Sequence, residues 1–293
     1  MNILITGGAG MLGHLLVNRF KSRHRVIYTT HRDAINIDGA EQMSWDLTQG
    51  RKALSGIDAV IHTAAMTNVD GCEKDPGQAH QSNVAATRNM VNSVPGAQVI
   101  YISTDFVFDG TRGNYSESDV PSPLSVYGRT KLEGEGEIPQ GGCIIRTSIY
   151  GLGSGPQRPG MVEKMIARLR NGETVNGFTD QIFTPVSTGN LALFLEEIME
   201  RRLAGIYNIG SSQPCTKYEF MRAAARTFGF DPEAVKPGLS SAVNYLAPRP
   251  RDVSLDTTKA RNTFKTEAWD LEKSFGFIKT QYLCHQDTKT QKL

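Results

Sequence analysis

A phenol and a primary amine lie four residues apart in the segment SVYGRTKLEGE, which spans residues 125–135. We expect this segment to be helical, and because residues four apart share one face of a helix, Tyr127 and Lys131 would lie side by side. A phenol has a pKa of about 10 and is a poor acid or base at neutral pH. A neighbouring ammonium would favour the phenolate and lower that pKa. The pair could then exchange a proton with a carbonyl or an alcohol.

Two hydroxyls follow an apolar run upstream of this helix. The segment VIYISTDFVFDG (99–110) indicates a strand that ends at Ser103 and Thr104. In an open parallel sheet, ligands bind at the carboxyl ends of the strands. A hydroxyl there could hydrogen-bond the oxygen on which Tyr127 acts. A YxxxK pattern alone is common on helix surfaces. Together with this hydroxyl and with the glycine motif near the N-terminus, it indicates a catalytic role for Tyr127 and Lys131.

Four glycines in seven positions directly follow the first apolar run, Asn2–Thr6. The segment GGAGMLG fits two spacings, one from Gly8 (GxGxxG) and one from Gly7 (GxxGxxG), which share Gly10 and Gly13. In either, the first glycine makes the tight turn, the middle one lets a pyrophosphate approach, and the last lets the helix pack on the sheet. The helix N-terminus then offers free N–H groups to the phosphates. A position between strand and helix favours dinucleotide binding over a plain turn.

The end of the second strand indicates which dinucleotide is bound. NAD binding usually places Asp or Glu there, on the ribose 2′-hydroxyl. The segment VIYTTHRD (26–33) has no acid before Asp33, and Arg32 could make a forked contact with a 2′-phosphate. A solvated surface arginine is the alternative. We therefore expect NADPH, with NADH still possible, and a cationic nicotinamide would add to the effect of Lys131 on the phenol.

The composition is that of an ordinary globular protein. The chain has 293 residues, of which 39% are hydrophobic, and 32 basic against 30 acidic residues give a formal net charge of +2. This balance favours neither nucleic acid nor a membrane surface as partner. No run approaches the length of a membrane span, and the N-terminus lacks the pattern of a signal peptide. The four cysteines, Cys72, Cys143, Cys215 and Cys284, form no CxxC motif, so we expect a protein of the reducing cytoplasm without a metal site. A homodimer is possible.

Short apolar runs alternate with longer helical patterns in the first half of the chain. The expected strands lack period-2 alternation, as strands buried on both faces do. They are Asn2–Thr6, Arg25–Tyr28, Ala59–His62, Gln98–Ile102 and Cys143–Thr147, and the helices between them are expected over 11–21, 77–93 and 123–137. This alternation predicts an α/β fold with a doubly wound, parallel Rossmann sheet.

The pattern changes after about residue 150. We expect an NAD(P)-binding domain over 1–150 with return segments from about 178–210, a smaller C-terminal α/β part over 151–285 that is mainly substrate-binding, and a polar tail over 286–293. Helices are expected over 161–171, 188–202 and 216–228, and a strand over 205–209. The proline-rich stretch 246–256 cannot form a regular helix.

Taken together, these motifs resemble the extended short-chain dehydrogenase/reductases over most of the chain. Further segments are similar to the dTDP-4-dehydrorhamnose reductase branch and occur in the same order: AAMTNVDGCEKDP (64–76) followed by Asn83, STDFVFDG (103–110), PLSVYGRTKLEGE (123–135), RTSIYG (146–151), TDQIFTPVST (179–188) and RPRDVSLDT (249–257). Two positions depart from that branch, because Phe106 stands where related reductases usually carry Tyr and Ile149 where they carry Trp.

The resemblance implies a role for each matching residue. The catalytic set would be Thr104, Tyr127 and Lys131. The cofactor would be held by Gly7, Gly10, Met11, Leu12 and Gly13 at the pyrophosphate, Asp46 and Leu47 at the adenine, and Thr63, Ala64 and Ala65 near the nicotinamide ribose. Ser103, Tyr127 and Lys131 would also bind the cofactor, with Lys131 on the ribose. The nucleotide-sugar side would hold Asp105, Phe106, Asp180, Gln181 and Arg249 or Arg251, beside Thr104 and Tyr127. Asp46 could instead be a helix N-cap, and the two arginines could be solvated loop residues.

The resemblance implies reduction of the 4-ketone of a nucleotide-activated 6-deoxy sugar by NADPH, with Tyr127 as proton donor. Related 4,6-dehydratases carry an Asp-Glu pair after the threonine, whereas this chain has Asp105 and Phe106, which argues against dehydration. A nucleotide-sugar epimerase, which retains its cofactor through a full cycle, stays open. So does a non-catalytic NADP-binding subunit, since the regulatory β subunit of methionine adenosyltransferase resembles the same branch.

Overall fold

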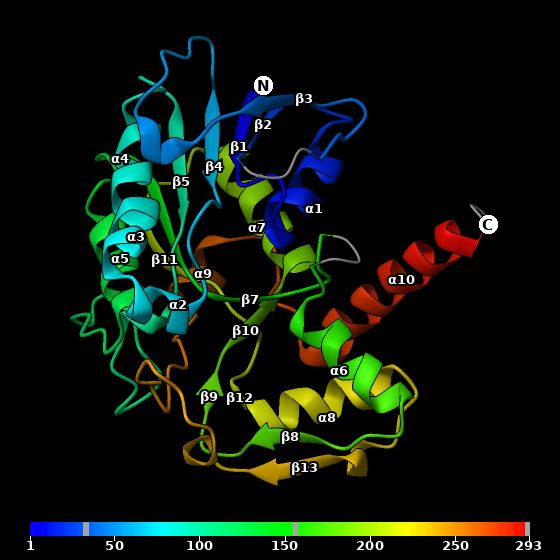
Figure 1. Ribbon diagram of the computed structural model, residues 1–293. Coiled ribbons are helices and arrows are strands. Elements are labelled where there is room, and N and C mark those ends of the chain that lie inside the picture. Colours follow the sequence, from blue (N-terminus) through cyan, green and yellow to red (C-terminus); the bar gives the residue numbers. More distant parts are fainter. Residues whose placement is uncertain (32–34, 155–157, 291–293) are drawn as a thin grey trace.

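A seven-stranded parallel sheet forms the centre of the molecule (Figure 1). The computed structural model describes residues 1–31, 35–154 and 158–290, with side chains described up to residue 284. The strand order is β11-β6-β5-β4-β1-β2-β3, and every neighbouring pair is parallel. The strands are β1 (Asn2–Thr6), β2 (Arg25–Thr30), β3 (Glu41–Ser44), β4 (Ala59–His62), β5 (Gln98–Ile102), β6 (Cys143–Arg146) and β11 (Gly205–Asn208).

Helices cover both faces of this sheet. On one face lie α1 (Met11–Phe20) and α7 (Thr188–Arg201), and on the other lie α2 (Val69–Lys74), α3 (Pro76–His80), α4 (Ala86–Val91) and α5 (Val126–Glu135) (Figure 1). Successive residues of a strand point to opposite faces, so Ile3 and Ile5 pack with α1 and α7 while Leu4 packs toward α4. This arrangement confirms the predicted doubly wound α/β fold.

A smaller α/β part follows β6 and has its own apolar core. Its strands are β7 (Ser148–Tyr150), β8 (Val175–Phe178), β9 (Ile182–Phe183), β10 (Pro185–Ser187), β12 (Cys215–Thr216) and β13 (Val235–Gly238), paired two by two, and its helices are α6 (Met161–Arg170), α8 (Lys217–Thr227) and α10 (Leu271–Thr290). Phe220, Phe275 and Ile278 are fully or almost fully buried between them. The short α9 (Thr258–Thr263) packs back against the large sheet through Ala260.

The predicted elements appear within two or three residues, except for the helix predicted over 77–93. The unpredicted strands and α-helices are strand β3 in the large sheet, the short paired strands of the smaller part and the helices α2, α9 and α10. Strand β3 reads EQMS and is largely exposed at the sheet edge, so it has no apolar run to reveal it. The single helix predicted over 77–93 is divided into α3, a π-helical segment η2 (Gln81–Ala85) and α4. Helix α10 continues to Thr290, so most of the segment predicted as a polar tail is helical, and 291–293 lie outside the described residues.

Among the residues described, no helix combines the length and the apolar character that a membrane crossing requires.

Helix α5 packs against the strand and loop beside it at a distance that only glycine permits. A Cβ atom added to Gly128 would lie 2.2 Å from the carbonyl oxygen of Phe106, and one added to Gly134 would lie 2.4 Å from the hydroxyl of Tyr101. Real Cβ atoms do not approach other atoms so closely, so these two glycines set how near α5 lies to the end of β5.

Replacing Gly128 by Ala should therefore lower the free energy of unfolding by about 1–3 kcal/mol, because the added methyl group must push α5 away from Phe106. The matched control is Gly276→Ala on α10, where nothing lies within 4 Å of the added Cβ. There the substitution should raise stability by up to about 1 kcal/mol, since Ala is the better helix former. Denaturant unfolding of the three proteins measures both effects, and equal stability of the two variants would contradict the packing argument.

Candidate active site

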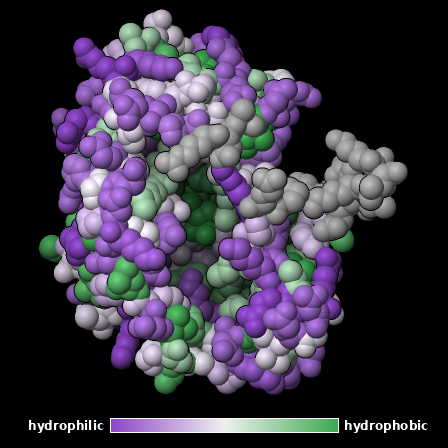
Figure 2. Space-filling view, viewed as in Figure 1, coloured by the Kyte–Doolittle hydropathy of each residue, from purple (hydrophilic) through white to green (hydrophobic). Residues whose placement is uncertain are grey.

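The loops that carry the predicted site residues meet at one edge of the large sheet. Strands β1, β4 and β5 are neighbours and parallel, so the segments after Thr6, His62 and Ile102 emerge together. The strand order reverses at β1, and such a reversal opens a crevice at the carboxyl ends. A groove of about 690 Å³ lies there. Figure 2 shows this face of the molecule hollowed between the large-sheet part and the smaller part.

Seven of the residues predicted to hold the cofactor line this groove: Gly7, Gly10, Asp46, Leu47, Thr63, Ala64 and Ala65. Other lining residues gave no signal in the sequence, among them Trp45, Gln78 and Arg158. These three come from separate segments of the chain, so only the fold brings them to the groove. Arg32, predicted to contact a 2′-phosphate, lies outside the described residues.

The glycine loop resolves the choice between the two spacings. Gly7 adopts a φ of +70°, a left-handed conformation that favours glycine, and its N–H donates to the Thr29 hydroxyl (3.2 Å). The tight turn is thus made by Gly7. Gly8 has a packing role, because a Cβ there would lie 2.5 Å from the ring of Tyr28. Gly13 is closed in as well, with the carbonyl oxygen of Gly7 2.3 Å from its Cβ position.

The first turn of α1 has the features of a phosphate-binding N-terminus. Its N-cap is Gly10, which supplies no side-chain hydrogen bond, and no acidic residue stands in the first turn. A Cβ on Gly10 would meet only the carbonyl oxygen of Gly7, at 3.2 Å, so its other side is open to the groove. The side chain of Leu12 is buried in the core and Met11 faces a neighbouring cavity, so both could serve a phosphate only through their backbone.

Asp46 combines the two roles considered for it. Its carboxylate accepts hydrogen bonds from the N–H and the hydroxyl of Thr48 (3.0 and 2.7 Å) and so caps the short helix η1 (Leu47–Gln49). One of its oxygens also lies 3.6 Å from Nδ1 of His31, a contact that is an ion pair when the imidazole is protonated, and Asp46 lines the groove. Asp46 is therefore a helix cap whose oxygens face the groove.

The phenol of Tyr127 lies next to the hydroxyl of Thr104. Ser125 caps α5 by accepting a hydrogen bond from Gly128 N–H (3.2 Å), which starts the helix at Val126 and sets the register of Tyr127. Burial raises the pKa of Tyr127 to about 12, and a hydrogen bond with Thr104 acts in the opposite direction. The expected lowering of this pKa by Lys131 is not seen in the protein alone, where burial sets the direction of the shift. A phenol with this pKa stays protonated at neutral pH, as a proton donor must.

Lys131 lies one turn further along the same helix face and is almost fully buried. Its ammonium donates to the carbonyl of Ile102 (2.7 Å) and sits 3.9 Å from the ring centroid of Tyr101. Burial lowers the pKa of Lys131 to about 7, while Glu135 acts in the opposite direction. The amine therefore changes charge near neutral pH.

Ser103 anchors a buried network that the sequence analysis missed. Its hydroxyl donates to Glu135 (2.6 Å), and Arg146 donates to both oxygens of the same carboxylate, with contacts of 3.0 Å from Nε and 2.7 Å from Nη2. Ser103 is 4% exposed and its hydroxyl hydrogen-bonds Glu135, the last residue of α5, so Ser103 links the end of β5 to α5.

Asp105 and Phe106, predicted on the substrate side, differ in exposure. Asp105 is 2% exposed and accepts a hydrogen bond from the hydroxyl of Thr104 (3.1 Å), so it stands behind Thr104. Burial raises the pKa of Asp105 to about 6, against the lowering effect of Lys217. Phe106 is half-buried, and its ring lies edge-on to Tyr127 with centroids 6.0 Å apart.

The other predicted substrate residues lie in the smaller part and already have partners. Asp180 accepts hydrogen bonds from the N–H and the hydroxyl of Ser240 (both 2.8 Å). The carbonyl of Gln181 accepts the N–H of Lys217 (2.9 Å). Arg249 pairs with Asp70 on α2 (3.1 Å), stacks on Tyr245 and keeps a buried Nη1 atom without a hydrogen bond, whereas Arg251 is exposed.

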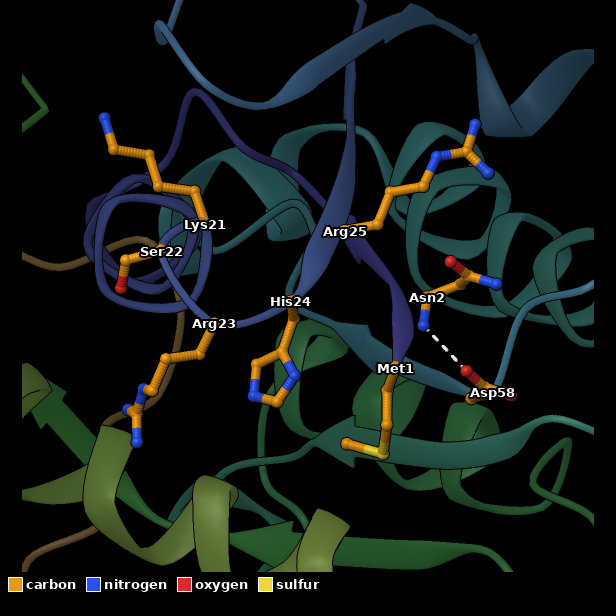
Figure 3. A pocket seen from close by; sticks show the side chains of 8 residues that line it. All are labelled: Met1, Asn2, Lys21, Ser22, Arg23, His24, Arg25 and Asp58. Carbon is orange, nitrogen blue, oxygen red and sulfur yellow. Dashed lines mark hydrogen bonds between the residues drawn. The ribbon is translucent and has the colours of Figure 1, made fainter.

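A second hollow, of about 510 Å³, lies at the opposite edge of the sheet (Figure 3). Its cationic side chains include Arg23 and Arg25, which pair with Glu196 and Glu41. The N–H of Asn2 donates to Asp58 at its rim (2.7 Å). It lies at the amino ends of β1 and β2, away from Tyr127, and brings none of the predicted site residues together.

Comparison with known proteins identifies the family. The sequence pattern described as the RmlD substrate binding domain matches residues 1–278. The chain belongs to this family. A relative from Haloferax volcanii, named a probable low-salt glycan biosynthesis reductase, is 29% identical over 96% of this chain and 98% of its own. The β subunit of methionine adenosyltransferase 2 from Rattus norvegicus is 28% identical over 88% of this chain and 80% of its own.

Two solved structures share the architecture. A hypothetical dTDP-4-dehydrorhamnose reductase from Sulfolobus tokodaii is 32% identical and superposes with a TM-score of 0.79 over 93% of this chain and 98% of its own. A dTDP-4-dehydrorhamnose reductase from Bacillus anthracis in complex with NADP has a TM-score of 0.77 over 96% of this chain and 99% of its own, and at 24% identity it shows the fold alone. The family and fold expected from the sequence are confirmed.

Burial of Lys131 predicts a pH dependence of stability. Its pKa in the folded protein lies below its value in the unfolded chain, so between these values the unfolded chain binds more protons and stability rises with pH. From pH 7 to pH 9 the free energy of unfolding of the wild type should gain about 1–2 kcal/mol relative to Lys131→Met. Urea unfolding of both proteins at the two pH values measures the difference, and parallel curves would contradict the shift.

Proposed function

We propose that the protein is an NADPH-dependent reductase that acts on a nucleotide-activated 4-keto-6-deoxy sugar. The observation that carries the proposal is the placement of Tyr127 against Thr104, with Lys131 one turn further along α5, at the edge of the sheet that carries the groove. The names of the Haloferax volcanii and Sulfolobus tokodaii relatives support a reductase of this kind.

The residues of the groove fit a dinucleotide. The uncapped first turn of α1 and the open side of Gly10 suit the pyrophosphate. Arg158 lines the same groove and approaches the carbonyl of Ala9 (3.3 Å), which brings a positive charge to the glycine loop. The Bacillus anthracis structure, which is a complex with NADP, supports NADPH as the cofactor, with Arg32 as the proposed contact of the 2′-phosphate.

The mechanism follows from the proton chemistry of the side chains. When bound, NADPH supplies the hydride that reduces the ketone carbon. Tyr127 donates its proton to the ketone oxygen, because an alkoxide is a stronger base than a phenolate even when the phenol pKa is about 12. Thr104 supports Tyr127 through their hydrogen bond. Lys131, one turn further along the same face of α5, would bring a positive charge to this side of the site when its amine is protonated, and such a charge would stabilise the phenolate left after transfer.

Two side chains proposed to contact the sugar nucleotide are the ring of Phe106 and the guanidinium of Arg249. Phe106 supplies an apolar edge next to Tyr127, which suits the apolar face of a 6-deoxy sugar. Arg249 supplies a guanidinium whose shape suits a diphosphate, and its Nη1 lacks a protein partner. Asp105 is followed by Phe106, whereas the dehydratases carry Glu at that position, so the site favours reduction over elimination of water.

Tyr127→Phe tests the proposal, because it removes the proton donor and leaves the ring. The variant should lose at least about 100-fold in turnover of a nucleotide-linked 4-keto-6-deoxy sugar. Its NADPH affinity, measured by fluorescence titration, should stay within a few-fold of the wild type. The matched control is Tyr282→Phe in the core of the smaller part, which should keep full activity. Undiminished turnover by the Tyr127 variant would refute the assignment.

The methionine adenosyltransferase relative favours a second candidate, a regulatory subunit that binds NADP(H) without useful turnover. A panel of 4-keto sugar nucleotides separates the possibilities through NADPH oxidation. A reductase oxidises NADPH with at least one member, whereas an epimerase converts a sugar nucleotide without net oxidation. Tight NADPH binding with neither reaction would favour the regulatory subunit.

A further inference from the structure

Lys217, a residue without any sequence signal, reaches from the smaller part toward the catalytic set. It is the first residue of α8, directly after β12, and the antiparallel pairing of β12 with β9 sets its position. Its N–H donates to the carbonyl of Gln181 (2.9 Å), and its ammonium lies 3.3 Å from the ring centroid of Phe183. Burial lowers the pKa of Lys217 to about 8, while Asp105 and Cys215 act in the opposite direction.

This ammonium acts electrostatically on the carboxyl group of Asp105, which accepts the hydroxyl of Thr104. One oxygen of Asp105, Oδ1, accepts the hydroxyl of Thr104 (3.1 Å), whereas Oδ2 is buried without a hydrogen bond in the structure. The hydroxyl of Ser148 also acts on the carboxyl group of Asp105. A buried carboxylate with an unsatisfied oxygen is costly, and Lys217 is the cation that offsets part of that cost.

We propose that Asp105 and Lys217 are positioning residues that control the single hydroxyl proton of Thr104 and return a proton to Tyr127 through it. This inference rests on the proposed reductase function. Tyr127 must regain the proton that it donates to the ketone, and we infer that this proton arrives from the side of Tyr127 that faces the smaller part of the molecule.

The proton that Tyr127 gives up is replaced from Asp105 through Thr104. As the ketone carbon takes up the hydride that NADPH would supply, the O–H proton of Tyr127 moves to the ketone oxygen, which leaves a phenolate. Asp105, in its protonated form, passes its proton to the oxygen of Thr104 while the Thr104 proton moves to the phenolate. The carboxylate of Asp105 then regains a proton from solvent, and the nearby ammonium of Lys217 sets how readily it does so.

The other titratable groups around this chain of residues are two thiols and the amine of Lys131 on α5. Asp105 faces Tyr127 on α5 and Lys217 on α8, Tyr127 also faces Cys72 on α2, and Lys217 faces Cys215 on β12. Burial raises the pKa of Cys72 to about 11 and that of Cys215 to about 12. The two thiols therefore stay protonated in the working pH range, and Lys131, whose pKa burial lowers to about 7, changes charge there together with Asp105 and Lys217.

Carbon-detected NMR of the Asp105 carboxyl group tests the pairing without any turnover. In Lys217→Met the pKa of Asp105 should rise by about one unit or more, because the stabilising charge is gone. Lys217→Arg keeps the charge and should restore most of the wild-type value. The control Lys273→Met removes an ammonium that also stacks on an aromatic ring, Trp269, and should change nothing. An unchanged Asp105 pKa in Lys217→Met overturns the inference.

Turnover supplies the second measurement. Lys217→Met and Asp105→Asn should each lose about 10- to 100-fold in turnover, with a shifted pH profile, while NADPH affinity stays within a few-fold. Lys217→Arg should recover most of the rate. Wild-type rates and pH profiles in Lys217→Met and Asp105→Asn would overturn the relay. Failure of the proposed function would be visible in the wild type itself, as the absence of NADPH oxidation with every sugar nucleotide tested.

Discussion

The buried ion pair between Glu135 and Arg146 joins three elements of the site. Arg146 ends β6, Glu135 ends α5, and Ser103, directly after β5, donates to the same carboxylate. The two charged side chains are only 6% and 3% exposed, and a charge buried so deeply is tolerated only beside its partner. Any rotation of α5 relative to β5 would separate these charges. The same rotation would part Tyr127 from Thr104, so the ion pair fixes the geometry on which the proposed proton transfer depends.

Spacing along α5 transmits this constraint to the chemistry. Tyr127, Lys131 and Glu135 follow one another at intervals of four, so anchoring Glu135 orients the whole face. A second anchor lies beside it, because Asn83 in the π-helical segment η2 donates to Thr130 (3.0 Å) and accepts the N–H of Met66 (2.8 Å). The irregular turn of η2 thus places an amide between α5 and the loop after β4. Strand ends and helix faces, rather than flexible loops, hold the reactive groups.

Backbone-driven features of the molecule could be predicted from the sequence, and contacts between distant side chains could not. Apolar runs and the glycine pattern were enough for six strands of the large sheet and for a glycine loop between β1 and α1, whereas the choice between Gly7 and Gly8 for the tight turn needed the backbone conformation of Gly7. Strand β3 gave no signal because its exposed residues are polar. Ser103 was expected at the cofactor, yet its hydroxyl belongs to Glu135, a contact across 32 positions. Lys217 reaches Asp105 only because β12 pairs with β9, which no local pattern reveals.

The proposed cofactor half of the site depends on backbone features, whereas the proposed substrate half depends on contacts between distant side chains. The cofactor half offers backbone N–H groups and glycines, which bind phosphates whatever side chains surround them. The substrate half offers side chains that already have partners, such as Arg249, which pairs with Asp70 across the two parts of the molecule. A diphosphate would gain from Arg249 only the difference between its own contacts and those of Asp70. Small changes in the proposed substrate half would therefore alter or abolish substrate binding while the proposed cofactor half stays intact.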